Sequence, residues 1–361
     1  MAAAGADFIK VDSCCGSQQR EEAFADYATM RDALNATGRS IFFALCGWNQ
    51  WFAPRGHELG NSWRIALDGT NWGALSHCAN INAPLSRYAK PGAWNDPDLL
   101  QGTGVGSNDL PTNPNGCFDP RHIPQSSNWY LTERQARAQM SLWAAMSAPL
   151  LISADPSQVS STMLEIWGNE EVIAVNQQFR DGGPYQGIRL AGTDLHFDPD
   201  TRHGSGTNVW GKWLPQNAFA LVFVNNGDLA ADVYCDRSCY TPMLSHAHQL
   251  VYSVRDVWAH ETVGAFASPY TIVARGLPPH GGSAMVQLNP VPSAQEAGQR
   301  AMLRKPLRSN VFERLACDVA SPTGDWGGQC SGEALGHKRR KKIREKKPKG
   351  KKGKKTIPTT A

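Results

Sequence analysis

The apolar and polar positions of the first half of the chain alternate between a strand period and a helix period. Residues 8–12 alternate like a short strand, and residues 40–45 are continuously apolar, like a strand buried on both faces. Between them, apolar side chains in residues 20–34 recur at spacings of three and four, which predicts a helix lying on a sheet. Further strands are expected at residues 62–66, 92–95 and 149–153, and the last of these is expected to be buried.

Helices are expected to follow these later strands. The predicted helices cover residues 71–88, 132–146 and 157–175, and a capping box from Thr132 to Gln135 opens the second. Strands that alternate with helices indicate βα units and a parallel sheet. We count five units, fewer than the eight of a closed barrel, which usually needs about 250 residues. An open barrel would expose two parallel edges and make the chain prone to aggregation.

The pattern changes after residue 186. Residues 187–290 contain short alternating runs separated by turn residues, without a helix period, which predicts an antiparallel β-sandwich. The expected strands are 195–197, 218–224, 249–254, 270–273 and 283–288. The predicted domains are therefore a partial barrel at 1–186, an antiparallel β-domain at 187–290, and a weakly ordered segment at 291–361 that ends in a Lys-rich disordered tail.

The net charge of +4 conceals an acidic body and a basic tail. Lys338–Lys355 contains thirteen Lys or Arg and one Glu, a charge of +12, so the other residues sum to −8. A lysine run binds phosphates without specificity, but this one has no aromatic residue on which bases could stack. We therefore predict no specific nucleic-acid partner.

Other features exclude further classes. No run of 18 apolar residues indicates a membrane span. Residues 1–12 lack the basic and long apolar regions of a signal peptide. Because a strand starts within seven residues of Met1, we expect Met1 to be internal to a longer chain or the gene model to be truncated. The nine cysteines show no paired CxxC spacing, which argues against zinc. Cys235 and Cys239 are close enough to bridge locally.

Carboxylates follow several predicted strands. Asp12 ends the first strand, the position at which α/β barrels keep their chemistry. The alternative is that Asp12 only caps the following turn. Asp68 follows the third strand, and Asp96 and Asp98 follow the fourth in an Asp-Pro-Asp turn that also arises for backbone reasons alone. We interpret Asp96 as structural.

Six segments in a fixed order carry a resemblance: GADFIKVDSC, FALCGW, GNSWRIALD, PGAWNDPDLL, SLWAAMSAPLLIS and NEEVIAVNQ. Together they resemble the melibiase family of retaining glycoside hydrolases, which includes α-galactosidases. The resemblance implies an α/β fold, a (β/α)8 TIM barrel followed by a C-terminal antiparallel β-sandwich. In this register the chain holds barrel strands 4 to 8, and the first-strand Asp pair and Trp that bind the sugar 4- and 6-hydroxyls are not in the sequence.

The resemblance also implies roles. Asp12 corresponds to the nucleophile and Asp68 to the general acid/base, while Lys10 and Arg64 resemble ligands of sugar hydroxyls and Asp98 lines the sugar pocket. A retaining glycosidase needs two carboxylates about 5–5.5 Å apart, one to attack the anomeric carbon and one to protonate the leaving oxygen. Such chemistry needs no metal and no organic cofactor.

Several neighbouring residues fit this chemistry. Lys10 would place a positive charge beside the nucleophile, and Trp63 and Trp72 could supply an apolar setting for the acid. Trp48 and Trp51 suit either sugar stacking or loop packing. The family pairs the cysteine at the position of Cys14 with one on the preceding strand, whereas Cys15 and Cys46 suit small buried hydrophobes.

Cys46, Gly47 and Trp48 are expected to bind substrate. Gly47 stands where α-galactosidases carry Glu, so we expect a wider pocket beside the sugar 2-hydroxyl and poorer activity on N-acetylgalactosaminides. The CGWNQW form also resembles a branch that includes β-L-arabinopyranosidases.

The predicted function is hydrolysis of terminal α-D-galactosyl residues from oligosaccharides, glycolipids or glycoprotein glycans. The alternatives are a β-L-arabinopyranosidase or an inactive fragment with weak carbohydrate binding. By resemblance the full-length protein would be extracellular or lysosomal/vacuolar. The sequence indicates no membrane partner and leaves the oligomeric state open.

Overall fold

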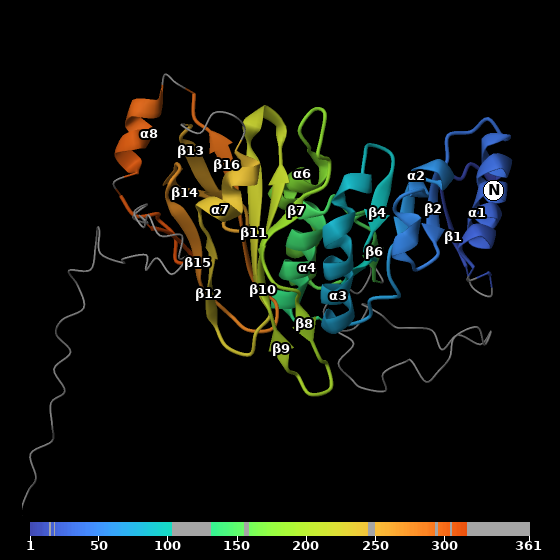
Figure 1. The fold of residues 1–361 in the computed structure, drawn as a ribbon, viewed down its shortest axis with the longest axis horizontal. Coiled ribbons are helices and arrows are strands. Elements are labelled where there is room, and N and C mark those ends of the chain that lie inside the picture. The colour runs from blue at the N-terminus through green and yellow to red at the C-terminus, as the bar shows by residue number, and fades with distance from the viewer. Residues whose placement is uncertain are drawn as a thin grey trace, which may run out of the picture.

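A computed structural model of the protein describes residues 1–13, 16–17, 19–102, 131–154, 159–244, 250–292, 295–303 and 305–315. Cys14, Cys15, most of the predicted Gly-rich loop and the predicted basic tail lie outside these residues. The described elements run from the first parallel strands at one end of the molecule to an antiparallel β-domain at the other (Figure 1).

The first half of the chain forms a parallel sheet in chain order, β1-β2-β3-β4. Its strands are β1 (Phe8–Asp12), β2 (Phe42–Cys46), β3 (Ser62–Arg64) and β4 (Trp94–Asp96). Two further strands, β5 (Leu100–Gln101) and β6 (Ile152–Ser153), pair in parallel as a separate ladder. The predicted partial barrel of parallel strands is confirmed.

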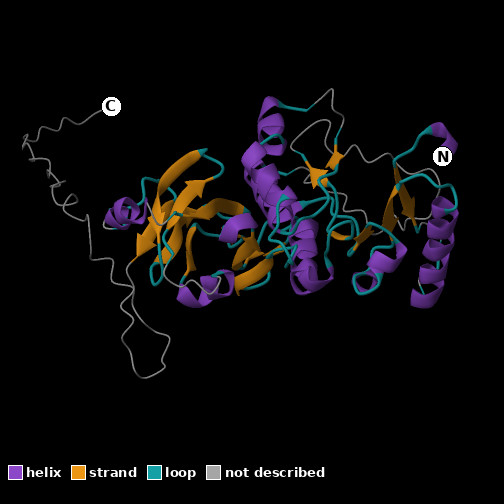
Figure 2. Ribbon diagram, turned by 90° about the horizontal axis from the view of Figure 1, so that it is seen from above, coloured by secondary structure: helices purple, strands orange, loops and turns teal. Residues whose placement is uncertain are grey.

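Helices connect and cover these strands (Figures 1 and 2). The helices are α1 (Arg20–Asn35), α2 (Gly56–Leu59), α3 (Trp72–Asn82), α4 (Glu133–Ala145), α5 (Ser161–Trp167) and α6 (Glu170–Gln177), with short 3-10 turns η1 (Ala2–Ala4), η2 (Gln50–Phe52) and η3 (Ala83–Tyr88). The predicted capping box of α4 is confirmed, because the Thr132 hydroxyl accepts from the Gln135 amide and the Gln135 side chain accepts from the Thr132 amide. The helix predicted at residues 20–34 is also confirmed.

Three local predictions were wrong. The single helix expected over residues 157–175 is two helices, because the Asn169 side chain accepts from the amides of Glu171 and Val172 and starts α6 anew. The helix expected over residues 71–88 becomes a 3-10 turn at Ala83, because Pro84 has no amide hydrogen to donate. Ile152 was expected in a buried strand but is 51% exposed, because β6 has only β5 beside it among the described strands.

The second half of the chain forms two antiparallel sheets that face one another (Figure 2). The six-stranded sheet has the order β14-β13-β16-β11-β10-β7 and the three-stranded sheet the order β12-β15-β17. The strands are β7 (Ile188–Gly192), β10 (Thr207–Trp213), β11 (Phe219–Asn225), β12 (Ala231–Cys235), β13 (Tyr252–Asp256), β14 (Glu261–Phe266), β15 (Thr271–Leu277), β16 (Gly282–Pro290) and β17 (Phe312–Leu315). A small hairpin joins β8 (His196–Phe197) to β9 (Gly204–Ser205). The predicted antiparallel sandwich is confirmed.

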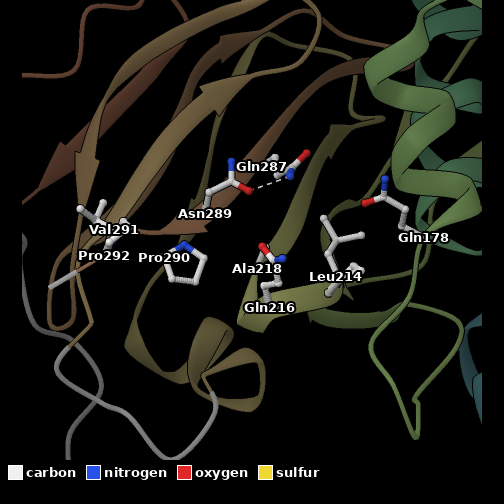
Figure 3. A pocket seen from close by; sticks show the side chains of 10 residues that line it. Gln178, Leu214, Gln216, Ala218, Gln287, Asn289, Pro290, Val291 and Pro292 are labelled. Carbon is white, nitrogen blue, oxygen red and sulfur yellow. Dashed lines mark hydrogen bonds between the residues drawn. The ribbon is translucent and has the colours of Figure 1, made fainter. Parts of the chain in front are cut away.

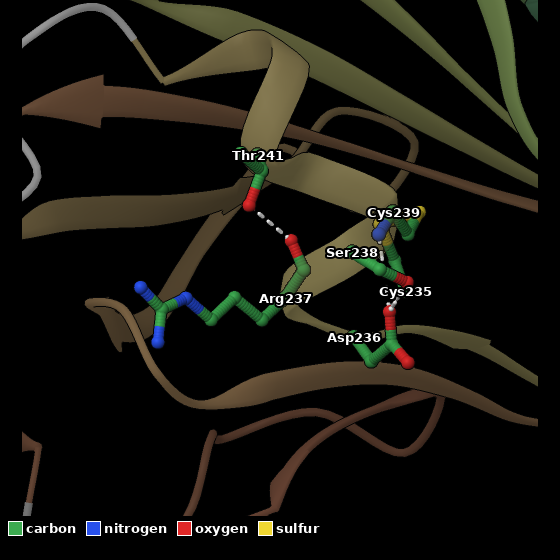
Figure 4. Close-up of a disulfide and its surroundings, with 6 residues drawn as sticks. All are labelled: Cys235, Asp236, Arg237, Ser238, Cys239 and Thr241. Atoms are coloured by element: carbon green, nitrogen blue, oxygen red, sulfur yellow. Dashed lines mark hydrogen bonds between the residues drawn. A yellow bond between two sulfur atoms is a disulfide. The ribbon is translucent and has the colours of Figure 1, made fainter. Parts of the chain in front are cut away.

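Short helical segments decorate the sandwich. They are η6 (Pro215–Asn217), α7 (Arg237–Tyr240), η7 (Thr241–Met243) and α8 (Glu296–Met302). A disulfide joins Cys235 at the end of β12 to Cys239 in α7, and the Asp236 side chain caps α7 by accepting from the Cys239 amide at 3.0 Å (Figure 4). The local bridge expected from the spacing of these cysteines is therefore present.

Two large hydrophobic cores and a small third cluster lie within the described residues. One fills the sandwich and includes Phe223 and Phe266, while the other extends from the parallel sheet through Trp143 of α4 to Trp210 of the six-stranded sheet. The buried Lys212 of β10 lies at this junction, and its side-chain nitrogen donates to carbonyl oxygens at the carboxyl ends of α4 and α6. These carbonyls belong to Ala144, Val175 and Asn176.

Candidate active site

The carboxyl ends of β1 and β2 place ionisable side chains around Cys46. Asp12 pairs in register with Cys46, and Lys10 lies two residues earlier on β1. Burial raises the pKa of the Cys46 thiol to about 12, the positive charges of Lys10 and Arg64 lower this pKa, and the carboxylates of Asp12 and Asp68 raise it. Cys46 of β2 therefore lies within electrostatic range of all four groups, which come from the two flanking strands β1 and β3 and the loop after β3.

Arg64 is the centre of a second, connected cluster. Its Nη1 lies 3.0 Å from Asp68 Oδ1, its Nη2 lies 2.8 Å from Asp98 Oδ2, and only 2% of the side chain is exposed. Burial lowers the pKa of Arg64, but the carboxylates of Asp98, Asp96 and Asp68 outweigh it and leave the pKa above its ordinary value. The arginine thus stays charged and holds carboxylates from two different loops.

Asp98 directs its side chain inward. Its carboxylate accepts from the amides of Gly69 at 2.5 Å and Leu99 at 2.7 Å, as well as from Arg64. Burial raises the pKa of Asp98 to about 6, although Arg64 lowers it. The backbone of Asp98 has a φ of 108°, a strained value for a residue other than glycine. These contacts support a positioning role toward Arg64, and the predicted contact of Asp98 with sugar stays a prediction.

Asp96, interpreted from the sequence as structural, holds this turn. Its Oδ1 accepts from the Asp98 amide at 2.9 Å.

Gly47 does not widen the site in the way expected. A Cβ atom at Gly47 would lie 2.1 Å from Cε2 of Phe52, so the Phe52 ring already occupies the space beside the glycine. Phe52 is fully buried and contacts Phe24 and Trp51. The expectation of a wider pocket was wrong, because a ring five residues further along the chain fills the volume.

The tryptophans divide between the loop and the core. Trp51 packs against Phe24, which favours loop packing over sugar stacking. Trp48 is half-buried and has a φ of 53°, so a strained backbone presents it next to Gly47.

Trp63 and Trp72 belong to the core. The Trp63 indole donates to Asn95 at 2.8 Å, and the Trp72 indole donates to Asn226 of the sandwich at 2.6 Å. Neither contact is directed to Asp68.

Two residues near the site were missed. Tyr27 of α1 donates to the Val11 carbonyl at 3.3 Å, and its pKa is raised by burial and by the neighbouring Cys46 and Asp12. The helical spacing of the apolar residues in α1 predicted only that Tyr27 packs into the core. Gly69 donates its amide to Asp98, and a backbone contact of this kind leaves no signature in a sequence.

The described residues offer no candidate membrane-spanning helix and no candidate metal site. In this part of the chain no helix combines the length and apolar character of a membrane span. The same residues contain no group of three or more His, Cys, Asp or Glu side chains suited to hold a metal ion.

The fold and the site define a class of protein. Carboxylates and cations gather at the carboxyl ends of parallel strands, the catalytic end of α/β-barrel enzymes, and an antiparallel sandwich follows. The family model described as "Alpha galactosidase A" matches residues 1–113 and 110–178, and the one described as "Alpha galactosidase C-terminal beta sandwich domain" matches residues 204–287. The chain belongs to the melibiase family of glycoside hydrolases.

Similar proteins agree with this family. An alpha-galactosidase of Oryza sativa subsp. japonica is 30% identical over 263 residues, 72% of this chain and 52% of the rice protein. Alpha-galactosidase 3 of Arabidopsis thaliana is 32% identical over 263 residues, 72% of this chain and 50% of that protein. This chain therefore spans about half the length of these relatives.

A solved structure shows the same fold. The alpha-galactosidase of Saccharomyces cerevisiae, solved with raffinose, superposes with a TM-score of 0.63 at 19% identity, covering 80% of this chain and 74% of that one.

Proposed function

We propose that this chain carries the catalytic groups of a retaining exo-glycosidase that hydrolyses terminal α-D-galactosides. The observation that carries the proposal is the convergence of Asp12, Asp68, Lys10 and Arg64 around Cys46 at the ends of β1, β2 and β3. Two carboxylates accompanied by two cations in one cluster suit a double displacement at a sugar carbon. The family and the names of the relatives support the choice of galactoside.

In the first step, an Asp12 oxygen forms a bond to the anomeric carbon while the bond from that carbon to the leaving oxygen breaks. Asp68 gives its proton to the leaving oxygen. In the second step, Asp68 takes a proton from water, the water oxygen bonds to the anomeric carbon, and the ester to Asp12 breaks. Inversion at each step gives overall retention.

The unequal exposure of the carboxylates around Arg64 suits these roles. Asp68 is 45% exposed and is accessible to a substrate. Asp98 is 5% exposed and holds the guanidinium of Arg64 from the protein interior. We assign Lys10 and Arg64 to the recognition of sugar hydroxyls, with Asp98 lining the pocket through its contact with Arg64, and Cys46, Gly47 and Trp48 beside the ring.

Phe52 should restrict which group the sugar can carry at its 2-position. Because its ring fills the space next to Gly47, the backbone there leaves little room for an acetamide group on the sugar 2-position. N-acetylgalactosaminides should therefore be poor substrates. Aryl β-L-arabinopyranosides share the ring hydroxyl pattern of galactose and form the comparison substrate. A galactosidase of this family would act outside the cell or in a lysosome or vacuole.

The test measures hydrolysis of aryl α-galactoside, aryl β-L-arabinopyranoside and aryl N-acetyl-α-galactosaminide by the chain. We expect the galactoside to be preferred and Asp12→Asn to abolish its turnover, because an amide cannot form the glycosyl ester. The matched control is Asp26→Asn, which removes an exposed carboxylate of α1 and should leave activity unchanged. Mass spectrometry after incubation with 2-deoxy-2-fluoro-α-galactosyl fluoride should find the label on Asp12. Undiminished turnover in Asp12→Asn, or a label elsewhere, would contradict the mechanism.

A further inference from the structure

A cavity of about 650 Å³ lies on the β-domain, and none of its lining residues comes from the parallel sheet. Three segments form it: Gln178 just after α6, the turn from Leu214 to Ala218 between β10 and β11, and residues 287–292 at the end of β16 (Figure 3). Its volume is within the range of small-molecule sites, roughly 300–1,000 Å³. The cavity is thus large enough for a ligand of its own.

The lining is polar but neutral. Four side chains carry carboxamides, those of Gln178, Gln216, Gln287 and Asn289. The buried Leu214, Ala218 and Val291 add apolar surface, and none of the ten lining residues carries a charge or an aromatic ring. A carboxamide offers two donors and an acceptor with two lone pairs, which matches a hydroxyl that both donates and accepts. An ionic ligand would find no counter-charge here.

Two of the carboxamides are arranged as a pair. Gln287 and Asn289 are two residues apart on β16 and therefore share one face of the strand. Gln287 Nε2 donates to Asn289 Oδ1 at 2.7 Å, which leaves the Gln287 carbonyl and the Asn289 amide hydrogens available for a ligand (Figure 3). Among the described residues, this is the one hydrogen bond that any of the four carboxamide side chains makes.

The opposite rim is a strained turn. Gln216 and Asn217 have φ values of 58° and 62°, in the left-handed region that glycine tolerates best. Strain of this kind recurs where a backbone presents a group to a ligand. In this turn the Gln216 side chain lines the cavity, whereas the adjacent Asn217 is not among the lining residues.

We propose that this cavity binds a neutral oligosaccharide, with hydroxyls on the carboxamides and C–H surfaces on Leu214 and Val291. The choice of a saccharide rests on the proposed function, since a glycosidase meets substrates attached to longer neutral glycans. The cavity would hold such a glycan apart from the cluster around Cys46. Binding there would raise the local concentration of substrate without taking part in bond cleavage.

The test titrates the chain with mannotetraose and cellotetraose, which carry no terminal α-galactosyl group, and detects binding by calorimetry or ligand-observed NMR. Gln216→Gly removes one carboxamide and relieves the left-handed strain, so the fold is preserved. Loss of one or two hydrogen bonds should weaken binding about two- to tenfold. The matched control is Asn217→Gly, which has the same backbone effect outside the cavity and should bind as the unaltered chain does.

Tetragalacturonate is the charged comparison and should not bind, because the lining offers no cation. Binding of neither neutral tetrasaccharide, or equal weakening by Gln216→Gly and Asn217→Gly, would overturn the proposal. The experiment is independent of turnover and is repeated in Asp12→Asn. If the chain binds the tetrasaccharides through Gln216 but hydrolyses no galactoside, the cavity proposal stands and the proposed function fails.

Discussion

Arg64 joins a buried carboxylate to an exposed one. Its Nη2 lies 2.8 Å from Asp98 Oδ2, and its Nη1 lies 3.0 Å from Asp68 Oδ1. The exposed fraction is 2% for Arg64, 5% for Asp98 and 45% for Asp68. The buried pair therefore fixes the guanidinium, and the exposed carboxylate is free to exchange this contact for one with substrate.

The two carboxylates should contribute very differently to stability. Asp98→Ala removes the acceptor for Arg64 and for the amides of Gly69 and Leu99, all inside the protein. Breaking such a buried pair should lower the free energy of unfolding by about 3–5 kcal/mol. Asp68→Ala removes an exposed contact to the same arginine and should cost about 0–1 kcal/mol. Urea unfolding at pH 7, above the pKa of about 6 for Asp98, measures both, and equal losses would contradict the distinction.

Asp98 should also make stability depend on pH. Burial raises the pKa of Asp98 to about 6, above its ordinary value near 3.8, so the folded protein holds this proton more tightly than the unfolded chain. The contribution of Asp98 to the free energy of unfolding is then fully present below pH 4. It declines by about 2–3 kcal/mol as the pH rises through 6. The measurement is urea unfolding of the unaltered chain and Asp98→Asn from pH 4 to 7. Parallel profiles for the two proteins would show that Asp98 does not titrate in this range.

Local signals in the sequence predict much of this fold. The helix from Arg20 and the capping box at Thr132 follow from contacts within a few residues, and both are present. Asn169 is also a residue type that favours a helix N-cap. The helical spacing of apolar residues continues on both sides of Asn169, however, and this favoured the prediction of a single helix. The strand ends that hold Asp12 and Arg64 were predictable because a short run with a strand period, followed by a carboxylate and small residues, is a local pattern.

The remaining features depend on contacts between distant segments. The exposure of Ile152 depends on which strands flank β6, and the burial of Lys212 depends on helix ends more than 30 residues away in sequence. The Phe52 ring beside Gly47 depends on the path of the loop between them. Hydrophobic periodicity carries no information on any of these three relationships.

Lys212 should give a second dependence on pH, of opposite sign. Burial lowers the pKa of Lys212 well below its ordinary value, so the folded protein binds this proton less tightly than the unfolded chain. The free energy of unfolding should therefore gain a contribution from Lys212 as the pH rises from 7 toward about 10.4, where the unfolded lysine also loses its proton. Lys212→Met should lack this rise. Lys305→Met changes an exposed lysine and is the control, and an identical slope in Lys212→Met and the unaltered chain would contradict the assignment.

Gly47 should be intolerant of any side chain. A Cβ atom there would lie 2.1 Å from Cε2 and 2.4 Å from Cζ of Phe52, whose ring is fully buried, so Gly47→Ala should destabilise the fold by about 1–3 kcal/mol through overpacking. Gly298→Ala is the matched control, because a Cβ atom in that helix meets nothing within 4 Å and alanine favours a helix by about 1 kcal/mol. Thermal and urea unfolding measure both variants. Phe52→Leu, which shortens the ring side chain, should recover part of the loss when combined with Gly47→Ala, as expected for two residues in contact. If Gly47→Ala were as stable as the unaltered chain, the space beside Gly47 would be open after all, and the expected discrimination against N-acetylgalactosaminides would lose its physical basis.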